Sequence, residues 1–246
     1  MGRVRFGWSL ATGVLAAWAC ALAGPPAQFD VVERLAAALT EGGILQVRAV
    51  LATEAVLTEH DFFVRSVSGA AAHTRLRELV PRGARLEVSF ESASADGALI
   101  VTRERLWLDD PPGGLAPLRS TVAYVVDGVR LLSITRVLDA DQRDVLMREA
   151  IVGAWRYPGY VFEWHADGTY DIVVAGSIPY DSGAYTIEGG VMRIVSDDQT
   201  AVCEPDDVGL WRVSFTNSDR HMLDKVEDTC VNGRHGPTAI LNRLAE

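Results

Sequence analysis

The chain has 246 residues, of which 48% are hydrophobic, and a formal net charge of −10 at pH 7. This length is enough for two compact domains or one large one. Because nucleic-acid binding needs a basic surface that neutralises phosphates, the charge argues against nucleic acid as a partner.

The first residues have the pattern of a secretory signal peptide. Arg3 and Arg5 form a charged region, the run from Phe6 to Leu22 is apolar, and Ala21-Leu-Ala23 is a small-residue cleavage site. Loss of the two arginines leaves a net charge of −12. We therefore expect an exported protein, periplasmic or secreted, that is cleaved near Ala23 and has no membrane anchor afterwards.

Two alternatives to a cleaved leader stay open. The uncharged run from Phe6 to Gln28 is just long enough to span a bilayer, and Cys20 could carry a lipid. A lipid-modified cysteine normally follows small residues, whereas the bulky Trp18 lies two positions before Cys20.

Outside the leader, the cysteines are Cys203 and Cys230. An even pair in an exported chain suggests one disulfide, and the alternative is two unrelated buried thiols. The spacing is far wider than Cys-x-x-Cys, which argues against a zinc site and against a thioredoxin-type redox motif. No metal and no cofactor are expected.

Three helices are predicted before any clear strand. The first covers residues 29–40, with an apolar stripe, a capping box of Asp30 with Glu33, and a stop at Gly42-Gly43. The second covers residues 44–51, and the segment from residue 53 to 67 is predicted to be irregular. The third covers residues 69–79 and has Ser68 as its cap. The stripe of the first helix consists of Val32, Leu35, Ala36 and Leu39.

The hydrophobic period then changes from helical to two. Strands are predicted around residues 85–91, 98–108, 121–126 and 129–137, and Asp127-Gly128 has the signature of a type I′ hairpin. Helices followed by an antiparallel meander predict an α+β domain.

This order of elements resembles the nuclear transport factor 2-like, or SnoaL-like, superfamily over residues 29–139. The local patterns that carry the resemblance are the segments 43–52, 68–79 and 127–137. The resemblance implies a cone-shaped domain in which a curved antiparallel sheet wraps three helices around an apolar pocket. Members include isomerases, dehydratases, hydrolases and proteins that only bind.

A helix from Ala140 to Ile151, opened by a capping box of Asp139 with Gln142, is predicted to connect this domain to a second one at residues 153–246. The second domain begins with Gly153-Ala-Trp155 and a hairpin closed by His165-Ala-Asp-Gly168.

Short strands with turn signals continue to residue 244. Counting residues 200–204 as a strand gives about eight, enough for a small up-and-down barrel. Gly153-x-Trp155, a closing Arg234 or Arg243 and Asp228-Thr-Cys230 make the domain resemble a bacterial lipocalin-like barrel. A late arginine stacked on Trp155 would close one end. The domain is short, so its own aromatic side chains are expected to fill the interior.

The sequence contains no nucleophile elbow, phosphate-binding loop or zinc-protease signature. The best candidate for chemistry is Glu104. Its strand places it on one face with Ile100 and Leu106, so it becomes a carboxylate in an apolar pocket if that face lines the cone. Tyr124 is the matching hydroxyl donor, since isomerases of the resembled family pair a carboxylate with a phenol. The alternative is an ion pair between Glu104 and a neighbouring arginine.

Further site candidates are His60, as a base at the mouth of the cone or an exposed loop residue, and the aromatic residues Phe90 and Trp107 as ligand contacts. The functional expectation is an exported binding protein that takes a small apolar molecule or a protein partner at the cone. The alternative is an isomerase or hydrolase with Glu104 as general base. A homodimer through the N-terminal sheet is also expected.

Overall fold

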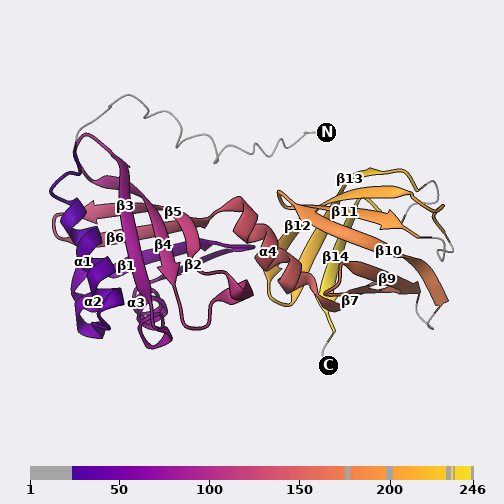
Figure 1. Cartoon of the computed structure of the whole chain (residues 1–246), viewed down its shortest axis with the longest axis horizontal. Helices are drawn as coiled ribbons and strands as arrows, with labels where there is room; N and C mark the ends of the chain where they lie inside the picture. The colour runs from indigo at the N-terminus through magenta and orange to yellow at the C-terminus, as the bar shows by residue number, and fades with distance from the viewer. Residues whose placement is uncertain (1–23, 175–177, 198–201, 231–233, 235, 245–246) are drawn as a thin grey trace, which may run out of the picture.

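The computed structural model describes residues 24–174, 178–197, 202–230, 234 and 236–244, so the predicted signal peptide lies outside the described residues. An α+β half and a β-barrel lie at opposite ends of the molecule, with one helix between them (Figure 1). Among the described helices, none has the length and apolar character needed to cross a membrane.

The N-terminal half has three α-helices, two short 3-10 helices and six strands. Its elements are α1 (Phe29–Thr40), α2 (Ile44–Val50), β1 (Leu51–His60), β2 (Val64–Ser68), α3 (Ala70–Arg77), η1 (Val80–Arg82), β3 (Arg85–Ala93), β4 (Leu99–Trp107), η2 (Pro112–Gly114), β5 (Leu118–Asp127) and β6 (Arg130–Leu138).

The six strands form one sheet in the order β2-β1-β6-β5-β4-β3. The meander β3 to β6 was predicted. The prediction of an irregular segment from residue 53 to 67 is wrong, because β1 and β2 form a hairpin there and β1 pairs in parallel with β6. The parallel partners of Val56 to His60 lie 77 residues further along the chain, so no local pattern marks the pairing.

Helices α1 to α3 pack against one face of this sheet. The predicted stripe of α1 is buried in that core, which confirms its helical spacing. The predicted caps are wrong. The N-cap of α1 is Gln28 and not Asp30, and the N-cap of α3 is Gly69 and not Ser68. Neither helix has a hydrogen bond from a capping side chain.

The predicted helix from Ala140 to Ile151 is confirmed as α4 (Ala140–Ile151), which begins after Asp139. Its capping box does not form. The Gln142 side chain instead accepts the backbone N–H of Arg119 (2.6 Å) and donates to the carbonyl of Pro117 (2.8 Å), so it fastens α4 to the start of β5.

The C-terminal half is a closed antiparallel barrel in which neighbours in sequence pair and β14 closes on β7. Its strands are β7 (Gly153–Tyr157), β8 (Tyr160–Trp164), β9 (Thr169–Val174), β10 (Ile178–Glu188), β11 (Val191–Ser196), β12 (Val208–Asn217), β13 (Arg220–Asp228) and β14 (Thr238–Arg243). The predicted count of eight strands is confirmed. One of them, however, is β7 and not the predicted strand at residues 200–204. Residues 202–204 lie outside any strand.

The first barrel hairpin forms as predicted. The side chain of Asp167 accepts the backbone N–H of Thr169 (2.9 Å), and Gly168 has a φ of 87°, a conformation that glycine adopts without strain. Phe162 and Trp164 point into the barrel and are almost fully buried. They join a core of aromatic and aliphatic side chains that fills the interior.

Of the two arginines left open for the closing contact, Arg243 stacks on the ring of Trp155, with 4.2 Å between its guanidinium carbon and the ring centroid. Arg234 has a different role in a buried ion cluster with Asp181 and Asp228. The predicted disulfide between Cys203 and Cys230 is present, with 5.0 Å between the two Cα atoms.

His221 is an uncharged histidine inside the barrel. It is fully buried, and neither ring nitrogen has a hydrogen-bond partner among the described residues. Its ring centroid lies 4.2 Å from that of Trp155. Burial, with a contribution from the charge of Arg243, lowers the pKa of His221 to about 3.

We predict that His221 makes the protein sensitive to acid. Because the folded-state pKa lies below the unfolded value of about 6.5, only the unfolded state takes up this proton as the pH falls from 6.5 towards 3. Stability is then lost by about 1.4 kcal/mol per pH unit. Urea unfolding measures the free energy of unfolding at pH 7 and pH 5. The decrease between the two should be about 2 kcal/mol smaller for His221→Leu than for the wild type. Equal losses in both proteins would contradict this.

Candidate functional site

The candidate carboxylate, Glu104, faces the helices and not the solvent. On β4, buried Ile100, Thr102, Glu104 and Leu106 alternate with more exposed residues, and Glu104 pairs in register with Ser120 of β5. Its side chain has no exposed surface. The strand period alone therefore predicted correctly which residues share the face of Glu104.

The two carboxylate oxygens of Glu104 have different partners. One accepts a hydrogen bond from the hydroxyl of Tyr124, and the other pairs with Nη2 of Arg136 at 3.2 Å. The hydroxyl of Thr102 lies 3.4 Å from the first oxygen. The structure thus brings the two predicted residues together and also forms the ion pair that was the alternative.

The surroundings fix the protonation states of the partners. Burial, with the neighbouring negative charge of Glu104, raises the pKa of Tyr124 well above its usual value, so its hydroxyl remains a donor. Burial alone would lower the pKa of Arg136, but Glu104, Tyr124 and Glu59 together outweigh it and the pKa is raised. A neutral phenol and a charged guanidinium both hold the carboxylate in place.

A small cavity opens beyond Arg136, between the end of the sheet, η1, η2 and α4. Its volume is about 100 Å³, and we name it the leucine cavity after the six leucines that line it. These are Leu79, Leu106, Leu108, Leu118, Leu138 and Leu146. Ser120 and Arg136 also line it, whereas Glu104 does not.

Charged side chains surround the cavity. Glu59 accepts from Arg75 at 3.1 Å and pairs with Arg65 at 3.3 Å, while Arg82 donates to the carbonyl of Asp110 (2.6 Å). Burial raises the pKa of Asp61 despite the nearby Arg65. The polar rim is therefore largely satisfied by its own pairs, and the leucines supply most of the surface for a ligand.

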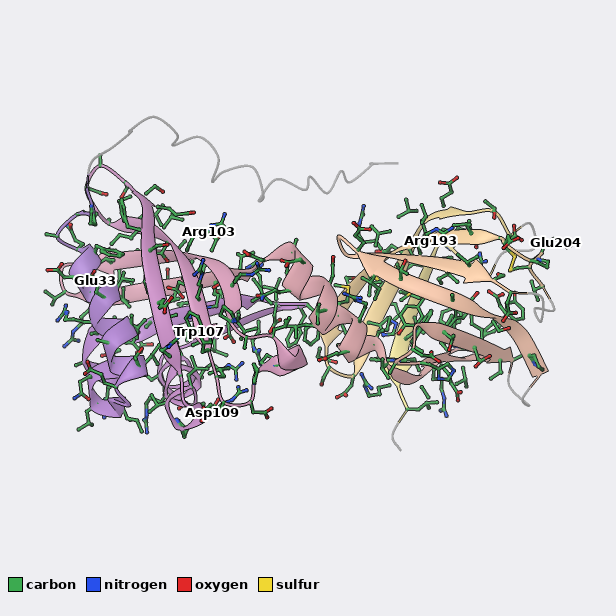
Figure 2. The ribbon with its side chains drawn as sticks, viewed as in Figure 1. Glu33, Arg103, Trp107, Asp109, Arg193 and Glu204 are labelled. Carbon is green, nitrogen blue, oxygen red and sulfur yellow. A yellow bond between two sulfur atoms is a disulfide. The ribbon has the colours of Figure 1, made fainter. Side chains whose placement is uncertain are left out.

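His60 ends β1, is half-buried and lines the leucine cavity. Trp107, which Figure 2 labels, lies on the opposite face of β4 from Glu104, and the guanidinium carbon of Arg85 lies 4.2 Å from its ring centroid. Phe90 packs edge-on against Phe29 of α1 in the core. The cavity thus brings together His60 and the Glu104 partner Arg136, but neither Phe90 nor Trp107.

Sequence reasoning missed Arg136 and Leu146. Arg136 had a detectable signal, since it shares the buried face of its strand with Ile134 and Leu138, where an arginine needs an acid. Leu146 had none, because its position depends on how α4 packs on η2.

No protein-family model and no curated protein matches this chain. Several solved structures are similar to about half of it. A Mycobacterium tuberculosis LEH-like epoxide hydrolase is 24% identical over 49% of this chain and 90% of its own, with a TM-score of 0.37. The epoxide hydrolase/cyclase-like enzyme SalBIII, of pyran ring formation in salinomycin, is 15% identical over 47% and 92%, with a TM-score of 0.40. An NTF2-like protein of unknown function from Cytophaga hutchinsonii is 8% identical over 49% and 96%, with a TM-score of 0.36.

Proposed function

We propose that this chain is an exported binding protein that holds a small apolar molecule, or an apolar side chain of a protein partner, in the leucine cavity. The observation that carries the proposal is a cavity walled by six leucines beside a carboxylate that is already fully engaged. The disulfide between Cys203 and Cys230 supports export to an oxidising compartment.

The volume limits what can bind. The leucine cavity measures about 100 Å³, whereas pockets for drug-sized ligands measure about 300 to 1,000 Å³. An apolar cavity of about 150 Å³ stays dry and can take up benzene or xenon. The ligand is therefore a compact apolar molecule of a few atoms, or the end of a larger one.

The geometry favours binding over catalysis. A general base must lie within hydrogen-bond reach of the proton that it removes. Glu104 does not line the cavity, and Arg136 lies between the two. The isomerase or hydrolase alternative keeps one observation in its favour, the contact of Glu104 with Tyr124, and it requires Arg136 to move.

The test fills the leucine cavity by replacing a small residue of its wall with a larger one. Ser120 is almost fully buried and lines the cavity, so Ser120→Leu should occupy most of its volume. Benzene at tenfold its dissociation constant should stabilise the wild type by about 1.4 kcal/mol and leave Ser120→Leu unchanged in thermal melts.

The matched control is Ser133→Leu on β6. Ser133 pairs in register with Val125, so both lie on the face of the sheet opposite to Ser120. This variant should respond to benzene like the wild type. A wild type that does not respond, or a Ser120→Leu variant that responds fully, would contradict binding in the cavity. Mass spectrometry of small molecules that copurify with the mature protein would then identify the natural ligand.

A further inference from the structure

A second concave site lies where the two halves of the molecule meet. It is a groove of about 340 Å³, which we name the junction groove, and it is distinct from the leucine cavity apart from the shared residues His60 and Asp61. Its walls come from the turn between β1 and β2, from α4, from the turn between β10 and β11, and from β12. Figure 1 shows α4 between the sheet and the barrel.

The floor of the groove is apolar. Phe62 of the β1–β2 turn packs edge-on against Phe215 of β12, with 5.2 Å between ring centroids, and Phe63 packs on Phe62. Met147 and Val213 complete this surface. The apolar part of a ligand can be buried from water against these side chains.

Two arginines line the same groove without an acidic partner. Arg143 of α4 is half-buried, its Nε is buried, and no hydrogen bond or ion pair reaches its guanidinium from the residues that the structure describes. Arg212 of β12 is exposed and also has no carboxylate partner in the described part of the chain. A buried guanidinium nitrogen without a partner is costly unless a ligand or solvent satisfies it.

The acids of the groove are already used. Asp144 accepts the backbone N–H groups of Gly189 (2.7 Å) and Gly190 (3.1 Å), which ties α4 to the barrel. Asp61 accepts the N–H of Phe63 (3.2 Å) and pairs with Arg65 at 3.5 Å. Neither acid pairs with Arg143 or Arg212 within the described part of the chain, so both guanidinium groups remain available to an anionic ligand.

We propose that the junction groove binds an amphiphilic carboxylate, with its headgroup on Arg143 and Arg212 and its apolar chain along Phe62, Phe63 and Met147. A guanidinium offers two parallel N–H donors that match a carboxylate, and one arginine from α4 and one from the barrel offer their donors to one ligand. The volume of about 340 Å³ is sufficient for a chain of moderate length. Binding would also fasten the two halves together, because the ligand contacts both.

The test uses octanoate as the probe and the full mature chain, with isothermal titration calorimetry at constant ionic strength. Octanoate should bind, acetate should bind at least tenfold more weakly for lack of a chain, and octanol at least tenfold more weakly for lack of a charge. Arg143→Met should weaken octanoate binding at least tenfold, since a hydrogen-bonded charge pair is lost. The control Arg193→Met, on the exposed face of β11 (Figure 2), should bind like the wild type.

Absence of octanoate binding, or equal affinity in Arg143→Met and the wild type, would overturn the proposal. Inorganic phosphate that displaces octanoate with equal affinity would also overturn it, because the groove would then be a general anion site. If Arg143→Met fails to fold, the exposed Arg212→Gln tests the same headgroup contact. Ser120→Leu should bind octanoate normally, so this site and the leucine cavity can fail independently.

Discussion

Replacement of Arg234 by Met is expected to lower the free energy of unfolding by about 4 kcal/mol, because it leaves two buried carboxylates without a cation. Arg234 has no exposed surface. Its Nε lies 2.8 Å from Asp181, another nitrogen pairs with Asp228, and Nη2 donates to the carbonyl of Asp207 (2.7 Å). Removal of one partner of such a cluster costs far more than the cluster contributes, since desolvated charges remain.

Urea unfolding at pH 7 measures this loss. Arg193→Met, which removes an exposed arginine of the same barrel, should change stability by less than about 0.5 kcal/mol. In the Arg234→Met background, Asp181→Asn should restore part of the loss, because it removes one uncompensated charge. A loss below about 1 kcal/mol for Arg234→Met would show that water reaches the cluster and that the charges are not desolvated.

Replacement of Glu104 by Gln is the second change with a large expected effect, about 3 kcal/mol of lost stability. Gln keeps the shape and still accepts from Tyr124, but it removes the ion-pair partner of Arg136, where only 11% of the arginine side chain is exposed. Charge removal from both partners, in Glu104→Gln with Arg136→Met, should be less destabilising than Glu104→Gln alone. Denaturant unfolding of both variants measures the difference, and no recovery in the double variant would contradict the ion-pair interpretation.

The same variant separates binding from catalysis. Under the proposed binding function, Glu104→Gln destabilises the fold but retains the cavity ligand, because the carboxylate does not line the cavity. If the wild type converts a copurifying ligand and Glu104→Gln binds it without turnover, Glu104 is a general base and the isomerase or hydrolase alternative replaces the binding proposal.

Features that depend on neighbouring residues could be predicted from the sequence. The period of two on β4 assigned Ile100, Glu104 and Leu106 to one face, and the turn residues Asp167 and Gly168 defined the first barrel hairpin. The helical connector from Ala140 to Ile151 was also predictable. In each case the chain geometry of a few consecutive residues decides which side chains share a face or close a turn.

The contacts between distant residues could not be predicted in this way. Arg136 reaches Glu104 across 32 residues, Arg234 reaches Asp181 across 53, and β1 pairs in parallel with β6 rather than forming a loop. The leucine cavity and the junction groove both arise between elements that are far apart along the chain. Local propensity and period fix backbone conformation over a few residues, but the partner of a buried charge is chosen by the packing of whole elements, where an unpaired charge is most costly.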